Sequence, residues 1–255
     1  MRQQIQKMIQ NYVKIYQIEN NIETKWREPI VKFADAKDEM FKELKKAVSE
    51  DHLMPENLLK GAESIVAFFI PFEKPIPETN IKGRYSSHEW AAAYIETNTL
   101  IGNINELIEK YLKEKGYQSA LVPATHNFSK ETLMSQWSHR HVAYIAGMGT
   151  FGINNMLITD AGCCGRIGTL VTDLKIKADD KIERENCLYK HNGTCGVCVG
   201  KCQFGALTFD GYTRRKCYGI CMENDEYHKN MGLTDICGKC LVGLPCSYIN
   251  PVKGN

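Results

Sequence analysis

Cysteine is the residue type with the clearest chemistry in this 255-residue chain. Nine of its eleven cysteines lie between residues 187 and 246. Two strings there share one form, a Cys-x-x-Cys pair followed by a further cysteine: Cys195, Cys198 and Cys202, then Cys237, Cys240 and Cys246. Two intervening residues allow one loop to point both thiolates at one centre. This spacing is therefore typical of metal and iron–sulfur sites.

The number of thiols in this segment matches two four-iron clusters. Each [4Fe–4S] cluster takes four thiolates, and in the bacterial pattern C-x2-C-x2-C-x3-C the last cysteine ligates the other cluster. The first string matches the last three cysteines of that pattern, with Asn192 at the first position. Cys187 is the nearest cysteine upstream of the first string, and Cys217 stands upstream of the second. We therefore predict two ligand sets: Cys187, Cys195, Cys198 and Cys246 for the first cluster, and Cys202, Cys217, Cys237 and Cys240 for the second.

Other roles for the thiols are open at this point. Two Cys-x-x-Cys pairs could form one tetrahedral zinc site, but zinc would leave four of the eight thiols without a role. Disulfide frameworks are typical of short secreted chains, and this chain begins without an apolar signal region. Cys163, Cys164 and Cys221 remain outside the two sets, and Cys221 competes with Cys217 as a ligand. Spare cysteines are commonly buried apolar residues.

Composition limits the partners. The chain has 32 basic and 30 acidic residues, a net charge of +2, and 43% hydrophobic residues, which suits a folded globular protein. This balance gives no overall case for nucleic-acid binding, and Lys42, Lys45 and Lys46 form the only modest basic cluster on a predicted helix. No apolar run approaches the roughly 20 residues that span a bilayer. We predict a cytoplasmic protein with no membrane partner, in a compartment where thiols stay reduced.

The elements that would position these thiols follow from hydrophobic periodicity and turn residues. We expect an α/β domain at residues 1–181 and a cluster-binding domain at residues 182–255. The predicted helices cover residues 5–16, 36–48 with Asp35 as the cap, a short segment from Pro55, 88–115 ending at Gly116, and 129–146 capped by Ser129. The predicted strands cover residues 64–72, 118–123, 155–159 and 167–174.

A glycine-rich loop follows the last predicted helix. Gly147-x-Gly149-x-x-Gly152 matches the dinucleotide fingerprint in letters, but that fingerprint needs a strand before it and a long helix after it. Here a helical pattern precedes the glycines, and only residues 153–161 separate Gly152 from Gly162. Two interpretations stay open: a plain helix-to-strand turn, or a backbone that lies against a large flat ligand, since glycine permits close approach.

Residues 139–174 and the following cysteines resemble the epoxyqueuosine reductase family, and are similar to the core of the cobalamin-dependent reductive dehalogenases. The shared features are the loop Ala146-Gly-Met-Gly149, the strand at 155–159, the glycine turn at 162–165 and the strand ending Thr-Asp-Leu at 172–174. The string CQFGAL at 202–207 has Gln203 where the family has proline, and RRKC ends in Cys217. The likeness covers about residues 60–250.

The resemblance implies a fold and cofactors. It implies an α/β (α+β, nitroreductase-like) domain followed by a C-terminal ferredoxin-like module with two [4Fe–4S] clusters. The first domain would bind cobalamin without an axial histidine, and the clusters would pass electrons to its cobalt. The corrin is then expected beside Gly147, Gly149, Gly152 and Asn154, and Arg166 could pair with a phosphate or amide group of the cofactor.

The predicted function is that of a cobalamin-dependent iron–sulfur oxidoreductase. Its substrate would be a small molecule or a corrinoid, and its electrons would come from a carrier such as ferredoxin or flavodoxin. The alternative is an electron-transfer protein without its own cobalamin, which would reduce a corrinoid protein or another partner. A third class is a zinc-stabilised interaction module.

The chain departs from the family at the expected acid. Epoxyqueuosine reductases place an aspartate about thirteen residues before the alanine-glycine, where this chain has Leu133. His139 and Glu131 are the candidates for a proton donor. His141 lies about 200° around a helix from His139, so the two cannot share a metal. Because the sequence also stops soon after residue 251 and its charge is near neutral, we do not expect tRNA as a substrate.

Overall fold

A four-stranded antiparallel sheet forms the centre of the protein, whose computed structural model describes residues 1–253. The strand order is β1-β2-β6-β3. The apolar run predicted as a strand becomes β2, and all eight of its residues are buried because both faces of the sheet are covered. It pairs along its whole length with β6, from Ser64 opposite Thr172 to Pro71 opposite Gly165. A separate hairpin of β4 and β5 contains part of the glycine-rich loop.

The bounds of the elements are as follows. The strands are β1 (Ile30–Asp35), β2 (Ser64–Pro71), β3 (Ser119–Leu121), β4 (Gly149–Phe151), β5 (Leu157–Thr159) and β6 (Gly165–Thr172). The helices are α1 (Arg2–Glu19), α2 (Met40–Ala47), α3 (Pro55–Leu58), α4 (Pro75–Thr79), α5 (His88–Glu114), α6 (His139–Ile145), α7 (Leu188–Asn192), α8 (Val197–Lys201) and α9 (Arg214–Tyr227).

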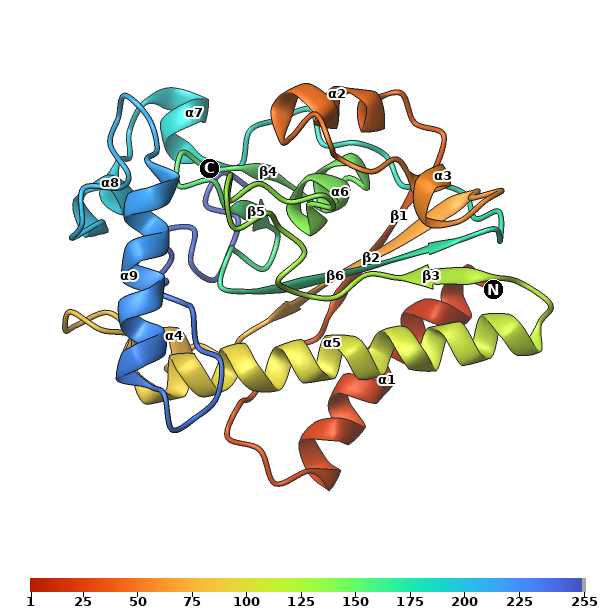
Figure 1. Cartoon of the computed structure of the whole chain (residues 1–255), viewed down its shortest axis with the longest axis horizontal. Helices are drawn as coiled ribbons and strands as arrows, with labels where there is room; N and C mark the ends of the chain where they lie inside the picture. Colours follow the sequence, from red (N-terminus) through yellow and green to blue (C-terminus); the bar gives the residue numbers. More distant parts are fainter. Residues whose placement is uncertain (254–255) are drawn as a thin grey trace.

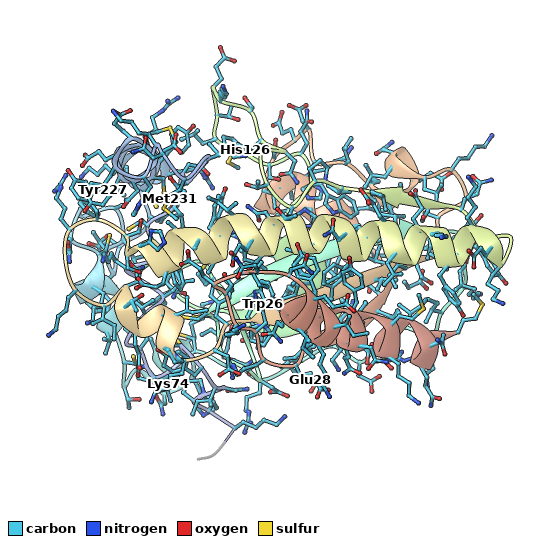
Figure 2. All side chains as sticks on the ribbon, turned by 90° about the horizontal axis from the view of Figure 1, so that it is seen from below. Trp26, Glu28, Lys74, His126, Tyr227 and Met231 are labelled. Carbon is cyan, nitrogen blue, oxygen red and sulfur yellow. The ribbon has the colours of Figure 1, made fainter. Side chains whose placement is uncertain are left out.

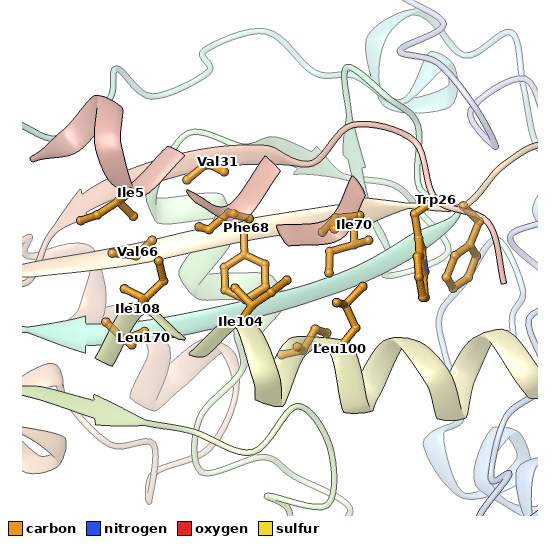
Figure 3. Close-up of a cluster of buried hydrophobic side chains, with 14 of the residues drawn as sticks. Ile5, Trp26, Val31, Val66, Phe68, Ile70, Leu100, Ile104, Ile108 and Leu170 are labelled. Atoms are coloured by element: carbon orange, nitrogen blue, oxygen red, sulfur yellow. The ribbon is translucent and has the colours of Figure 1, made fainter. Parts of the chain in front are cut away.

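Helices cover both faces of the sheet, which gives three layers (Figure 1). Successive side chains of a strand point to opposite faces. Thus Val66 and Phe68 of β2 alternate with Ala67 and Phe69, and the two pairs belong to different hydrophobic clusters. The first cluster includes residues of α1 and α5, and Figure 3 shows Phe68 beside Ile104 of α5. The second cluster includes residues of α2 and α6.

The cysteine-rich segment gathers at one end of the sheet. Helices α7, α8 and α9 lie there (Figure 1). Asn250 and Lys253 contact Asp160, the residue that follows β5. The turn at residues 162–165 also lies at this end of the sheet. It follows β5 and leads into β6. A domain boundary between residues 181 and 182 stays a prediction. No helix within residues 1–253 is long and apolar enough to cross a membrane. The cytoplasmic location stays a prediction.

Most predicted helices and strands are present, but two helices begin later in the chain than predicted. The helix predicted from Ser129 begins only at His139. The Ser129 hydroxyl accepts hydrogen bonds from the next residues, but Leu133 adopts a left-handed φ of 57°, so the turn cannot continue as a helix. Asp35 does not cap a helix, since it ends β1 and its carboxylate accepts a hydrogen bond from the Lys37 backbone N–H. The elements that were not predicted are strands β1 and β4 and helices α4, α7, α8 and α9.

Candidate functional site

The first predicted ligand set lines a small apolar pocket. Its lining includes all four thiols of that set: Cys187, Cys195, Cys198 and Cys246. Cys187 stands at the N-terminus of α7 and Cys198 lies within α8, so two short helices and the segment at residues 244–246 bring the sulfurs together. Burial raises the pKa of Cys198 to about 12, and the other three thiols act in the same direction. Such thiols stay protonated unless a metal centre replaces the proton.

The second predicted set lines a larger cavity of about 490 Å³. Its wall includes Cys202, Cys217, Cys237 and Cys240. Burial raises the pKa of Cys240, and Cys217, Cys237 and Cys202 add to the effect as neighbouring thiols. Cys221 also lines this cavity, one helical turn from Cys217 on α9. Its hydrogen bond is the main reason that the pKa of Cys217 falls to about 6. Cys221 therefore remains a competing ligand.

The two sets adjoin each other. Cys198 and Cys246 of the first set pack in one hydrophobic cluster with Cys202 and Cys240 of the second, together with Leu207 and Leu244. Among residues 1–253, no three Cys, His, Asp or Glu side chains are placed to hold a single metal ion. The assignment of each cysteine to a cluster stays a prediction.

The adjacent cysteines of the glycine turn pack against this region. The Cys163 backbone N–H donates to the carbonyl oxygen of Cys246 at 2.9 Å. The Cys164 thiol lies 3.2 Å from the carbonyl oxygen of Leu241 and is fully buried. Cys163 also contributes to the cavity wall beside the second set. The turn thus fixes the segment that contains Cys246 against the end of the sheet.

Arg166 of β6 lines the large cavity without a hydrogen-bond partner among the described residues. Its Nε is buried and unpaired, and its guanidinium carbon lies 4.4 Å from the ring centre of Tyr94. Burial lowers the pKa of Arg166. A buried guanidinium is costly unless its donors are satisfied. Arg166 can therefore donate to an acceptor group of a molecule in the cavity.

A hydrogen-bonded network beside Arg166 joins three distant segments. The Tyr94 hydroxyl of α5 donates to Asp235 at 2.6 Å, and the second carboxylate oxygen of Asp235 lies 3.0 Å from Nε2 of His126. Burial raises the pKa of Tyr94 to about 12. All three residues line the cavity. In Figure 2, His126 lies on one side of α5, and the core residue Trp26 lies on the other side. Sequence reasoning missed this network, since no local motif joins its members.

His139 is held by the protein rather than free to act on a ligand. Its Nδ1 lies 2.8 Å from the Thr169 hydroxyl, and its Nε2 lies 2.9 Å from the carbonyl oxygen of Pro123. Burial lowers the pKa of His139 to about 4, so the ring is neutral near pH 7. Both nitrogens are thus occupied, which favours a structural role. His141 also lines the cavity, with Nδ1 2.7 Å from the Ser138 hydroxyl.

Glu131, the other candidate donor, is exposed and does not line the cavity. Its carbonyl oxygen accepts a hydrogen bond of 2.6 Å from Arg215. Leu133, at the position of the expected acid, does line the cavity. The loop therefore reaches the cavity as the resemblance implies, but it brings an apolar side chain there.

The glycine-rich loop is placed differently from the expectation. A Cβ on Gly147 would lie 2.1 Å from the carbonyl oxygen of Asp180, and one on Gly149 would lie 2.3 Å from that of Ile158. On the Cβ side of both glycines the neighbour is therefore protein backbone. Gly152 and Asn154 line the pocket of the first ligand set, and none of the four lines the large cavity. Of the predicted cofactor contacts, only Arg166 lies at the cavity.

A basic rim lies beside the cavity. Arg140 and Arg214 line it, and Arg214 begins α9, followed by the exposed Arg215 and Lys216. None of these four side chains has a carboxylate partner within residues 1–253. The N-terminus of a helix also favours anions. Sequence reasoning missed this rim because α9 itself was not predicted.

A mixed α/β domain is thus joined to a cysteine-rich end, with a cavity between the thiols and the sheet. Solved structures of two kinds of reductase have a similar fold. A structure of epoxyqueuosine reductase with an epoxyqueuosine-modified tRNA stem loop superposes with a TM-score of 0.62 at 19% identity, over 96% of this chain and 65% of that one. A reductive dehalogenase of B12-dependent chemistry superposes with a TM-score of 0.57 at 17% identity, over 88% of this chain and 31% of that one.

In sequence, the chain is similar to the epoxyqueuosine reductase of Listeria monocytogenes, with 26% identity over 196 residues. That match covers 74% of this chain and 46% of the relative, so the chain spans about half the length of the curated protein. No protein-family model matches the chain. The resemblance predicted from residues 139–174 is confirmed, and the predicted oxidoreductase class agrees with these reductases.

One expectation is wrong. The sequence was taken to disfavour tRNA as a partner, because the charge is near neutral and the sequence stops early. An epoxyqueuosine reductase with this fold is seen with a tRNA stem loop, and this chain matches 65% of that protein's length. Overall net charge was a poor guide, since nucleic-acid binding depends on a local basic surface.

Proposed function

We propose that this protein is an oxidoreductase in which two [4Fe–4S] clusters supply single electrons to a cobalamin in the large cavity. One observation supports the proposal above all. The eight predicted ligands divide between two adjoining pockets, and the second set forms part of the cavity wall. Electrons that reach the cluster of the second set would therefore arrive at the wall of the cavity in which we propose that cobalamin binds.

The residues present fit the clusters. The first pocket offers four thiols, which is the number that one [4Fe–4S] cluster requires. The large cavity offers the four of the second set together with Cys163 and Cys221. The first pocket is otherwise lined by apolar and small side chains, with Asn154 as an exception, so it can enclose a cluster away from water. Because the thiols come from segments far apart in the sequence, ligation would also stabilise the folded segment.

The residues at the cavity also fit a corrinoid. Arg166 has five N–H donors and no acceptor among the described residues, and the periphery of a corrin carries amide and phosphate acceptors. Apolar side chains such as Phe128, Leu133 and Met156 form other parts of the wall and would exclude water. Bound cobalamin would supply a cobalt centre that takes up single electrons and reduces carbon–heteroatom bonds.

Proton supply falls to residues that line the cavity. Removing an epoxide oxygen as water consumes two electrons and two protons. His126, which is hydrogen-bonded to Asp235, is the side chain that we propose for this. Leu133 replaces the expected acid, His139 is fully hydrogen-bonded, and burial lowers the pKa of His141 to about 4. His126 is about one third exposed and so connects the cavity with solvent.

A tRNA stem loop is the substrate that we propose for the basic rim. Arg214, Arg215 and Lys216 can contact phosphates, while a modified base enters the cavity that Arg214 borders. A ferredoxin or flavodoxin would deliver the electrons.

Cobalamin titration into the anaerobically purified chain tests the cofactor. Cluster absorption together with the band of base-off cobalamin supports the proposal, and clusters without cobalamin binding would indicate the electron-transfer alternative. The substrate is tested by turnover of an epoxyqueuosine-containing tRNA stem loop. Replacing Arg215 and Lys216 by Gln should weaken stem-loop binding and reduce its salt dependence, because fewer counterions are released. The same change at Lys45 and Lys46 of α2, a matched basic pair, should have little effect.

A further inference from the structure

The two ligand sets differ in the charges that surround them. Lys239 stands between Cys237 and Cys240 of the second set and is 2% exposed. Its ammonium donates to the carbonyl oxygens of Asn80 and Lys82, at 2.9 and 2.8 Å, and to the Asn80 side-chain oxygen at 3.1 Å. These partners are neutral, and no carboxylate pairs with Lys239 in residues 1–253. Its positive charge is therefore left to act on the adjacent sulfurs.

Arg140 adds a second cation to the same set. It lines the cavity together with Cys217 and Cys240, and its Nη1 donates to the carbonyl oxygen of Asn155 at 2.6 Å. That partner is also neutral. The charge of Arg140 is therefore left to act on the sulfurs of the same cavity wall.

The first set has no comparable cation. The pocket of Cys187, Cys195, Cys198 and Cys246 contains no charged residue in its lining. Lys190, three residues after Cys187, lies 3.9 Å from the carboxylate of Glu185, so its charge is partly balanced.

Other influences do not cancel this difference. Asp235 lies near the second set, but its carboxylate is engaged by the Tyr94 hydroxyl and by His126. Backbone N–H groups near the sulfurs do not separate the two sets, since Cys198 and Cys246 of the first set and Cys237 of the second each accept one. Cys202 of the second set accepts a further hydrogen bond from the Leu207 N–H at 3.3 Å.

We infer that Lys239 and Arg140 make the second cluster the centre of higher reduction potential, so that electrons entering at the first cluster pass to the one beside the cavity. Reduction adds one negative charge to a cluster, and a nearby cation stabilises that form. In each transfer one electron leaves the first cluster and one reaches the second. A one-electron carrier protein then reduces the first cluster again. The inference rests on the proposed function, since it requires both clusters.

A redox titration followed by electron paramagnetic resonance tests the inference on the anaerobically purified full chain. Wild type should show two separate potentials. Arg140→Met and Lys239→Met should each lower only the higher one, whereas Arg140→Lys should leave it nearly unchanged. Lys190→Met, near the first set, is the matched control and should move neither potential by a comparable amount. If Lys239→Met does not fold, Arg140→Met still tests whether a nearby cation raises the potential of the second cluster.

Two kinds of failure are distinguishable. A shift of only the lower potential in Arg140→Met, or no shift in either, would overturn the charge assignment while leaving the clusters in place. Iron and sulfide measured on the same samples report on the clusters themselves. Wild-type protein with no four-iron signal would overturn the inference together with the proposed function.

Discussion

The side-chain amide of Asn154 donates a hydrogen bond of 2.9 Å to the carbonyl oxygen of Cys240. Asn154 is buried, and its own side-chain oxygen accepts a hydrogen bond from the Met156 N–H. The turn after β4 is thereby tied to the second cysteine string. Asn154 was expected to contact a corrin, but its polar atoms are already used to hold two parts of the protein together.

Replacing Asn154 by Ala should lower the free energy of unfolding by about 1–3 kcal/mol, because a buried carbonyl loses its donor. Urea denaturation of anaerobically purified protein measures this. Asn230→Ala is the control, because Asn230 is exposed and its side chain makes no hydrogen bond within residues 1–253. It should change stability by less than about 0.5 kcal/mol. Equal stability of Asn154→Ala and wild type would show that the hydrogen bond from Asn154 to Cys240 does not stabilise the fold.

Gly149 should not tolerate even a methyl group. A Cβ there would lie 2.3 Å from the carbonyl oxygen of Ile158, so Gly149→Ala should destabilise the fold by about 1–3 kcal/mol or more. Gly102, in the exposed face of α5, has no atom within 4 Å of its Cβ position, and Gly102→Ala should stabilise by up to about 1 kcal/mol. Thermal unfolding of both variants checks this. A Gly149→Ala protein as stable as wild type would show that the hairpin can shift.

The buried state of His139 predicts a pH dependence of stability. Its pKa is about 4 in the folded protein, against 6.5 when exposed, so the unfolded chain binds more protons as the pH falls below about 6.5. At pH 5.5 this linkage should cost about 1 kcal/mol relative to pH 7.5. In His139→Gln, that part of the change between the two pH values should disappear.

Urea denaturation at both pH values measures the effect. Comparing each protein with itself removes any constant loss from the substitution. His191→Gln, at an exposed position, is the matched control and should keep the full wild-type change. An identical pH dependence in His139→Gln and wild type would contradict the assignment of a buried, neutral ring.

The ligand sets can be separated by single substitutions. Cys195→Ser removes one thiol from the first set and should reduce iron content by about half, because one cluster loses its fourth ligand. Cys163→Ser should leave iron content unchanged, although this thiol lies close to Cys246. Iron analysis of both variants shows which of the two cysteines is a cluster ligand. A loss of half the iron from Cys163→Ser would show that the first set contains Cys163.

Local sequence signals were sufficient for part of this structure. Cys-x-x-Cys spacing is a local property, and the structure brings the cysteines of each predicted set to one pocket, with Cys163 and Cys221 also at the larger one. The assignment of ligands to clusters stays a prediction. Strand β2 and helix α5 were predictable because their apolar periodicity is long and ends at clear turn residues such as Gly116, which adopts a φ of 83°.

Contacts between distant segments were not predictable in the same way. The glycines at 147 and 149 carry no sign that they pack on Asp180 and Ile158 rather than on a ligand. The link from Tyr94 through Asp235 to His126 joins α5, the loop after α9 and the loop after β3, which have no shared pattern. Helix α9 was missed because only two of its fourteen residues are buried, so it lacks a clear apolar face.

Two four-iron clusters held by eight cysteines in two adjoining pockets would give the protein a distinctive metal content. The iron, inorganic sulfide and zinc content of the anaerobically purified full chain measures this directly. We expect about eight iron and about eight sulfide per chain, with little zinc. One or two zinc ions per chain with little iron or sulfide would contradict this expectation, and would make the cysteine-rich end a zinc-stabilised module instead.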